Sequence, residues 1–285
     1  MTALSTPMAG PRRRRGARYL EIGLALTLAA IAASLLGLVY TPYAPSQVDL
    51  LHRLAPPSLA HVFGTDRFGR DVLSRVLAGG WRSLVLGFGA TGLGLAIGLP
   101  IALATGYYRG YLDQIVMRFI DALLSIPTLV FALLIIVGLG VGEPQAILAL
   151  GIAASPKFVR IIRGAVIDAA SQDYVVAAKA RGERDLYIQY RELLPNVLPP
   201  IIVEGSVNIG FAVMGGAALS YLGLGTQPPH ADWGVMINEA QQYISVSFWP
   251  LLGPAAAICL SIIGFNLFGE GLRDRLHLRD SLGRE

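Results

Sequence analysis

Long apolar runs make up most of the chain, and its charged residues are confined to short blocks between them. Charge-free runs at 83–108, 122–142 and 240–269 each exceed the roughly 20 residues that an α-helix needs to cross the core of a bilayer. Counting such runs predicts six spans, at about 20–40, 83–107, 119–140, 144–162, 198–222 and 248–269. We therefore expect an all-α membrane protein with six transmembrane helices.

Two of the predicted helices carry charges within their apolar runs. Lys157 and Arg160 interrupt the fourth run, and we expect them at the water boundary, where long basic side chains reach toward water. Glu204 lies inside the fifth run, and an acid there usually faces a cavity or the bundle interior because a charge in lipid is costly. Glu204 is therefore either a structural hydrogen-bond anchor or a group that lines a pathway. For Asn208, in the same run, we expect a hydrogen bond between helices.

The distribution of lysine and arginine indicates the orientation, because these residues favour cytoplasmic loops. If the N-terminus lies inside, 18 of the 23 basic residues fall in the inside segments, and the other five lie between 53 and 82. We therefore expect both termini in the cytoplasm. The predicted divisions are a basic tail at 1–18, a first transmembrane helix at 19–40, an external loop at 41–82, a five-helix core at 83–271 and a cytoplasmic tail at 272–285.

The N-terminal segment also fits a second interpretation. Four arginines at 12–15 precede an apolar run, as in a secretory signal, and residues 30–32 offer a cleavage site. The apolar run continues to residue 39, which is longer than a typical signal core. We therefore favour an uncleaved first helix.

A charged segment at 168–196 connects two apolar runs, and neither bilayer nor channel lining explains its many ionisable groups. We expect this segment, DAASQDYVVAAKARGERDLYIQYRELLPN, to contact another protein. It resembles the cytoplasmic coupling loop of ABC importer permeases, although Val176 stands where that family has Glu. The residues that carry the resemblance, with Asp173 beside them, are Tyr174, Ala177, Ala178, Gly182, Leu194, Pro195 and Asn196. The resemblance implies two short helices that meet near Gly182 and dock into a cleft on a separate ATPase.

Two further segments narrow the resemblance to the peptide and nickel uptake subfamily, in its C-type subunit. They are HVFGTDRFGRDVLSR at 61–75 and SYLGLGTQPPHADWG at 220–234. The resemblance implies a type I ABC importer fold, a pore shared with a second related permease, two ATPase subunits and an external substrate-binding protein. It also places the external gate, or the surface that docks the binding protein, at Tyr221, Gly223, Gly225, Pro228 and Trp233.

The sequence contains no recognisable nucleotide-binding, metal-binding or catalytic motif. A phosphate-binding loop needs Gly-Lys-Ser/Thr, but Lys157 follows proline and Lys179 follows alanine, so ATP and magnesium would be bound by partner subunits. A single cysteine and four isolated histidines offer no metal site. The basic residues lie at membrane edges and form no face interleaved with aromatic residues, which excludes a nucleic-acid partner. We therefore expect a permease subunit of the bacterial inner membrane, surrounded by lipid, and not an enzyme.

The cargo remains open at this point. Uptake of dipeptides or oligopeptides is the first interpretation, and transport is expected to follow alternating access driven by the ATPases. The same machine could carry nickel chelates, glutathione or another small solute. A passive channel or a membrane scaffold is a distant alternative, for which the segment 168–196 would be a simple connector.

Overall fold

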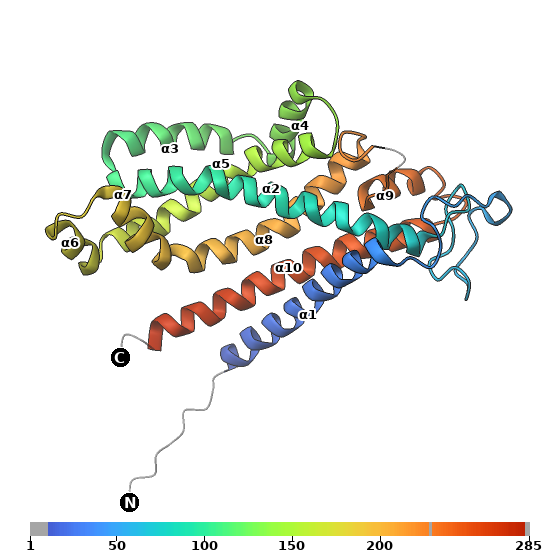
Figure 1. The fold of residues 1–285 in the computed structure, drawn as a ribbon, viewed down its shortest axis with the longest axis horizontal. Helices are drawn as coiled ribbons and strands as arrows, with labels where there is room; N and C mark the ends of the chain where they lie inside the picture. Colours follow the sequence, from blue (N-terminus) through green and yellow to red (C-terminus); the bar gives the residue numbers. More distant parts are fainter. Residues whose placement is uncertain (1–10, 228–229, 283–285) are drawn as a thin grey trace, which may run out of the picture.

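A computed structural model describes residues 11–227 and 230–282, which form an elongated helical bundle (Figure 1). An all-α fold is thereby confirmed for the described residues. The elements in chain order are α1 (Pro11–Val39), η1 (Leu50–His52), α2 (Val72–Tyr108), α3 (Gly110–Leu124), α4 (Thr128–Leu139), α5 (Glu143–Ala170), α6 (Asp173–Ala180), α7 (Asp185–Tyr187), η2 (Ile188–Leu193), α8 (Leu194–Tyr221), α9 (Trp233–Gln241) and α10 (Trp249–Leu282).

Five helices within the described ranges are long and apolar enough to cross a membrane, and α3 with α4 adds a sixth span if the two are counted together. The five are α1, α2, α5, α10 and a continuous helix from Asp185 to Tyr221 that comprises α7, η2 and α8. The predicted number of six spans therefore holds when the bent pair is taken as one.

The third predicted span, 119–140, is not one straight helix. α3 ends at Leu124 and α4 begins at Thr128, and the two are bent by 91° at this break. Pro127 precedes α4 and explains the break, because proline has no N–H to donate and disfavours helical backbone in the residue before it. The apolar run continues through the bend, so hydropathy alone does not reveal it.

Two helices extend further than their apolar runs. α2 begins at Val72, within the predicted external loop, and the Asp71 side chain caps it by accepting a hydrogen bond from the Ser74 backbone N–H at 2.7 Å. α5 continues to Ala170, so Lys157 lies near the midpoint of the helix. The charged residues after Lys157 therefore continue the helix beyond the predicted span at 144–162.

Glycines bring α2 close to α5 at the centre of the bundle. Gly94 and Gly98 lie against Phe158, and a Cβ added to Gly98 would stand only 2.8 Å from the Phe158 Cβ. Phe158 is fully buried. Small residues spaced four apart allow helices to approach closely where lipid offers no hydrophobic driving force. This contact forms the core against which α8 also packs.

α1 packs along α10 in the same way. A Cβ on Gly23 would stand 2.2 Å from the Phe268 backbone nitrogen, and one on Gly271 would stand 2.4 Å from the Leu20 nitrogen. The other side of α1 exposes large apolar side chains, which suits contact with lipid. They include Ile22, Leu24, Leu28, Leu35 and Leu36. α1 is thus an integral part of the bundle.

The loops are divided between the two ends of the bundle (Figure 1). α6 and α7 lie at one end, together with the beginning of α1 and the end of α10. The long loop between α1 and α2 lies at the other end, beside α9. We call these the coupling end and the loop end.

Candidate functional site

The segment 168–196 projects from the coupling end of the bundle. α6 occupies Asp173–Ala180, and Gly182 turns the chain with a φ of +77°, which glycine adopts at little cost. The chain then enters the continuous helix from Asp185, whose η2 part has π-helical hydrogen bonding. The segment therefore has one short helix and the extension of a membrane helix, and the expectation of two short helices was wrong for the second.

One side of α6 anchors this segment and the other side is free. Val175 and Ala178 are fully buried against the bundle, whereas Val176 and Ala177 are exposed. Tyr174 is half-buried, and burial, assisted by the charge of Glu192, raises the pKa of its phenol. Among the remaining predicted residues, Leu194 is half-buried, and Asp173, Gly182, Pro195 and Asn196 are exposed.

Polar contacts fix the segment to the rest of the chain. The Tyr107 hydroxyl at the end of α2 hydrogen-bonds to Asp185 Oδ1 at 2.7 Å, and Lys179 Nζ lies 4.6 Å from the centre of the Tyr107 ring. Asn196 donates from Nδ2 to the Glu192 carbonyl at 2.7 Å. The two contacts of Tyr107 therefore hold the segment against the end of α2.

The free side of the segment exposes large apolar side chains among its charged residues. Val176 is 60% exposed, and three further large side chains beyond the turn are also exposed: Leu186, Tyr187 and Tyr190. An apolar surface at such a position indicates a protein interface. This surface, formed by Val176, Ala177, Leu186, Tyr187 and Tyr190, is called the coupling surface below.

A groove of about 810 Å³ opens beside the coupling segment. Its floor is α8, and α5 and α10 form its walls. The polar residues that line it include Asp168 and Gln172 at the end of α5, Tyr174 and Asn196 in the coupling segment, Glu204 on α8 and Arg273 on α10. The groove therefore brings the coupling segment and Glu204 to one concave face.

Glu204 has a specific partner at the inner end of this groove. Lys157 Nζ lies 2.6 Å from Glu204 Oε1, so α5 and α8 are joined by an ion pair within their membrane-spanning parts. Lys157 Nζ also lies 5.5 Å from the centre of the Phe211 ring, one of the exposed apolar residues on α8. Glu204 therefore combines the two alternatives: its ion pair with Lys157 anchors α8 to α5, and its side chain lines the groove.

Asn208 lies inside the bundle. Its Nδ2 donates to Thr91 Oγ1 on α2 at 3.0 Å, and both side chains are buried. The contact joins α8 to α2. This arrangement is the interhelical hydrogen bond expected from the sequence.

At the loop end, the residues expected at the gate have different environments. Trp233 is 3% exposed; its Nε1 donates to the Val76 carbonyl at 3.0 Å and its backbone N–H to Ser83 Oγ at 3.2 Å. Trp233 therefore anchors α9 to α2 and offers no surface to a partner. Gly225 is buried, whereas Gly223 is exposed with a φ of +78°. Tyr221 donates to Gln241 Oε1 at 2.5 Å, and Pro228 lies outside the described residues.

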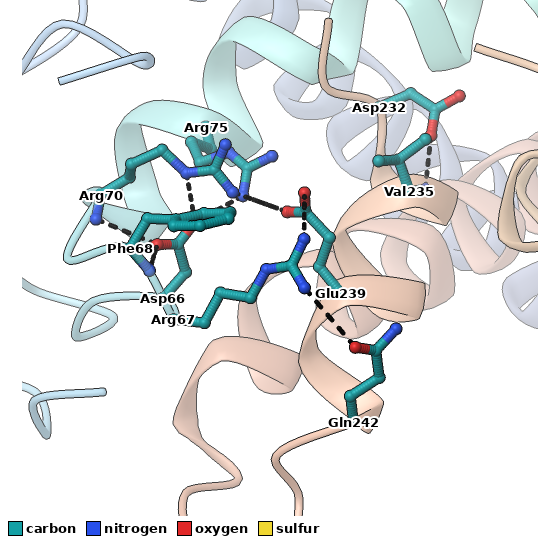
Figure 2. Close-up of polar contacts among 9 residues, drawn as sticks. All are labelled: Asp66, Arg67, Phe68, Arg70, Arg75, Asp232, Val235, Glu239 and Gln242. Atoms are coloured by element: carbon teal, nitrogen blue, oxygen red, sulfur yellow. Dashed lines mark hydrogen bonds and ion pairs between the residues drawn. The ribbon is translucent and has the colours of Figure 1, made fainter. Parts of the chain in front are cut away.

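A cluster of ion pairs joins the external loop to α9 (Figure 2). Asp66 Oδ2 accepts hydrogen bonds from Arg70 Nε and from an Arg75 amino group, both at 2.6 Å. Glu239 Oε2 accepts from the same two arginines at 2.8 and 2.6 Å. All four side chains are largely buried. We call these residues, Asp66, Arg70, Arg75 and Glu239, the external ion cluster.

Further arginine contacts surround this cluster. The Arg67 and Arg70 guanidinium carbons lie 4.5 and 4.7 Å from the centre of the Phe68 ring. Arg67 also donates to Gln242 Oε1 at 3.5 Å, as Figure 2 shows. Arg67, Arg70 and Arg75 are thus held by acids, an amide and an aromatic ring.

The segment 61–75 folds the beginning of α2. Asp71 accepts from the Ser74 hydroxyl at 2.7 Å in addition to capping the helix, and its other oxygen lies 2.9 Å from His61 Nδ1. Gly64 and Gly69 both have a φ of +73°, as tight turns require. The motif therefore has a structural role in this chain, because it builds the turn that leads into α2.

Comparison with known proteins identifies the family. Residues 96–279 match the binding-protein-dependent transport system inner membrane component family. The chain belongs to this family. Among its relatives, the probable D,D-dipeptide transport system permease protein DdpC of Escherichia coli K12 is 40% identical over 250 residues, which cover 86% of this chain and 84% of the relative. The glutathione transport system permease protein GsiD of Escherichia coli O6:K15:H31 is 40% identical over 220 residues, 77% of this chain and 73% of the relative.

A solved structure shows the same fold. The inward-facing MetNI methionine ABC transporter contains a chain that superposes with a TM-score of 0.59 at 20% sequence identity, covering 72% of this chain and 95% of that chain. The predicted fold of a type I ABC importer permease is thereby confirmed. The chain is a multi-pass membrane permease of an ABC importer.

The external ion cluster was not predicted from the sequence, because its members lie far apart along the chain. The match to the permease family begins at residue 96, so Asp66, Arg70 and Arg75 lie before it, whereas Glu239 lies within it. One signal is present in the sequence: five arginines fall between 53 and 82, and basic side chains that become buried need acidic partners. Glu239, which pairs with two of these arginines, lies far from them in sequence, so the sequence alone did not predict the pairing.

Proposed function

We propose that the chain is the permease subunit of an ATP-driven importer of dipeptides or oligopeptides, which receives its cargo from an external binding protein. The coupling surface carries this proposal, because an exposed apolar surface beside a membrane bundle requires a protein partner. The resemblance to permeases of dipeptide transport supports peptides as the cargo.

The partners follow from the same proposal. Two ABC ATPases on separate chains bind ATP and magnesium, and one docks on the coupling surface. A second related permease completes the pathway, and this chain itself catalyses no reaction. The exposed apolar residues of the external loop are suited to contact the binding protein, and they include Leu50, Leu51, Leu59 and Val62.

The proposed orientation puts the coupling end in the cytoplasm and the loop end outside, in the bacterial inner membrane. The start of α1 and the end of α10 both lie at the coupling end, which supports cytoplasmic termini (Figure 1). The 18 basic residues predicted inside support the same orientation.

Glutathione is the second candidate cargo. The resemblance to GsiD supports it, and glutathione is itself a small peptide with charged ends. Import assays with a radiolabelled dipeptide and with glutathione, using the complete transporter in membrane vesicles, distinguish the two. Faster uptake of glutathione at equal concentration would replace the first proposal with the second.

The coupling proposal is tested by Ala177→Glu, which places a charge on the exposed side of α6 without disturbing its buried side. We expect the variant to insert normally but to retain less than a tenth of the ATPase that co-purifies with the wild type, because burying an unpaired charge costs several kcal/mol. Ala60→Glu is the matched control, since Ala60 is an exposed alanine at the loop end. Normal ATPase retention by Ala177→Glu, or equal loss in both variants, would contradict the proposal.

A further inference from the structure

Three basic residues on α5 each meet a carboxylate from a flanking helix. Lys157 pairs with Glu204 on α8, Arg160 Nη1 lies 3.6 Å from Asp121 Oδ1 on α3, and Arg163 donates to both carboxylate oxygens of Asp113, also on α3. These residues recur three apart along the helix, so each side chain is turned by about 60° around the helix axis from the one before it. Only the first of the pairs includes a residue that lines the groove.

The exposed charge of Lys157, near the middle of α5, shows which face of this helix is not in contact with lipid. The Lys157 side chain is 44% exposed, although it lies about 20 Å along α5 from either end of the helix. A charged group within the apolar part of a membrane helix is costly in hydrocarbon, so such residues face a water-filled cavity or another protein. The face of α5 and α8 that carries Lys157 is therefore wet or covered by protein.

The groove connects this position to the coupling end. Ile161, Ala165 and Asp168 line it and continue the helical stripe that begins at Lys157, at intervals of four, four and three residues. On α8, the lining runs from Asn196 to Glu204, which is about 12 Å of helix rise. The ion pair thus closes the inner end of a polar groove whose outer end lies at the coupling segment.

The composition of this inner end suits a particular class of solute. A carboxylate and an ammonium lie next to each other, with the exposed Phe211 ring beside them. A free peptide has one ammonium and one carboxylate, and its side chains are often apolar. A site with one group of each sign can exchange its internal pair for the two charged ends of such a solute without leaving a net charge uncompensated.

We propose that Lys157 and Glu204 form a binding station for zwitterionic solutes on the transport pathway. Glu204 receives the ammonium of the solute, Lys157 receives its carboxylate, and the two residues pair again after the solute leaves. This inference rests on the proposed peptide cargo, and it names the residues that recognise the charged ends common to all peptides.

A purely structural role makes a different prediction, which a double variant separates. Removing one member of an ion pair leaves an unpaired charge, whereas replacing both members by neutral residues of similar size is often tolerated. If the pair only joins α5 to α8, the double variant Lys157→Met/Glu204→Gln should regain the import that each single variant loses. If the pair binds the solute, the double variant should remain slow.

The experiment measures dipeptide import by the complete transporter in proteoliposomes, with saturating binding protein and ATP. We expect the double variant to keep its melting temperature and its ATPases but to lose at least tenfold in maximal import rate. Arg163→Met/Asp113→Asn is the matched control, because it removes another ion pair of α5 that does not line the groove. The control should import within about twofold of the wild type.

A second measurement tests whether the station is reached by water and solute. Phe211→Cys, in a Cys259→Ala background, places a thiol beside Lys157 without changing the pair. We expect a membrane-impermeant maleimide to label it in inside-out vesicles, and a saturating dipeptide to slow that labelling at least threefold.

Several outcomes would overturn the station. Import restored in the double variant, or equal loss in the control, would assign the pair a structural role. Loss of the second permease from the purified double variant would place the pair at the interface between permeases. Absence of labelling at Phe211→Cys would show that water does not reach it. A wild-type transporter that imports no dipeptide would refute the proposed cargo, and the station with it, whatever the variants do.

Discussion

Two neighbouring alanines in the coupling segment have opposite environments. Ala177 is exposed and Ala178 is fully buried, among side chains that include Val175, Ile188 and Leu193. The sequence could predict that this segment contains small residues for close contact. It could not predict which of them faces outward, because α6 has only 8 residues and packs against parts of the chain that are distant in sequence.

The two positions should therefore respond differently to the same substitution. We expect Ala178→Glu to destabilise the purified permease by roughly 3 kcal/mol or more, because it buries a carboxylate without a partner. Ala177→Glu should stay within about 0.5 kcal/mol of the wild type, as most exposed substitutions do. Thermal unfolding in detergent measures both. Equal melting temperatures for the two variants would show that α6 is not seated as described.

Asp232 holds the beginning of α9 and was not singled out in the sequence. Its Oδ1 accepts from the Val235 backbone N–H at 2.7 Å and its Oδ2 from the Ser220 hydroxyl at 2.5 Å. We expect Asp232→Ala to cost about 1–2 kcal/mol, as the loss of a helix cap does. Asp232→Asn should cost less, since its amide oxygen can still cap the helix. Thermal unfolding provides the comparison, and an alanine variant as stable as the wild type would contradict the role.

At the scale of elements, hydropathy predicted where the chain crosses the membrane but not where helices break or continue. The run at 122–142 carries no charge, yet Pro127 separates α3 from α4, which are bent by 91° relative to each other. Conversely, the family resemblance implied a separate short helix after Gly182, but the helix that begins at Asp185 continues into α8. Backbone hydrogen bonding decides both features, and hydropathy reports only the surroundings of side chains.

The external ion cluster should behave as a unit that joins the external loop to α9. Glu239→Gln removes a carboxylate shared by Arg70 and Arg75, and we expect it to destabilise the permease by about 3 kcal/mol because charge stays buried with fewer partners. Adding Arg75→Met should recover part of this loss. Thermal unfolding and protease resistance of the loop at 41–71 measure the effect.

Additive stability losses in the double variant would contradict the interpretation that the external ion cluster behaves as a unit. If the costs of Glu239→Gln and Arg75→Met add in the double variant, the two side chains do not interact. Gln242→Ala is a suitable control, since the Gln242 side chain meets Arg67 at the exposed margin of the cluster and should change stability by less than about 0.5 kcal/mol.

At the scale of the whole molecule, the sequence predicted the number of spans and the family, but it did not predict which helices lie together. The contact of α1 with α10 joins the two ends of the described chain through Gly23 and Gly271. Such contacts depend on the matching of two surfaces, whereas hydropathy and charge are properties of single segments. The distribution of basic residues nevertheless predicts an orientation that matches the grouping of loops at two ends (Figure 1).

This orientation is tested by thiol labelling, because the chain has a single cysteine, Cys259, which can be replaced by alanine. Ser46 lies in the loop between α1 and α2, and Ser171 lies between α5 and α6; both are exposed, so each serine can become a cysteine with little change in size. We expect a membrane-impermeant maleimide to label Ser46→Cys in intact spheroplasts and Ser171→Cys only after permeabilisation. The Cys259→Ala parent controls for background labelling. Labelling of Ser171→Cys in intact cells would place the coupling surface outside, where no ATPase could reach it.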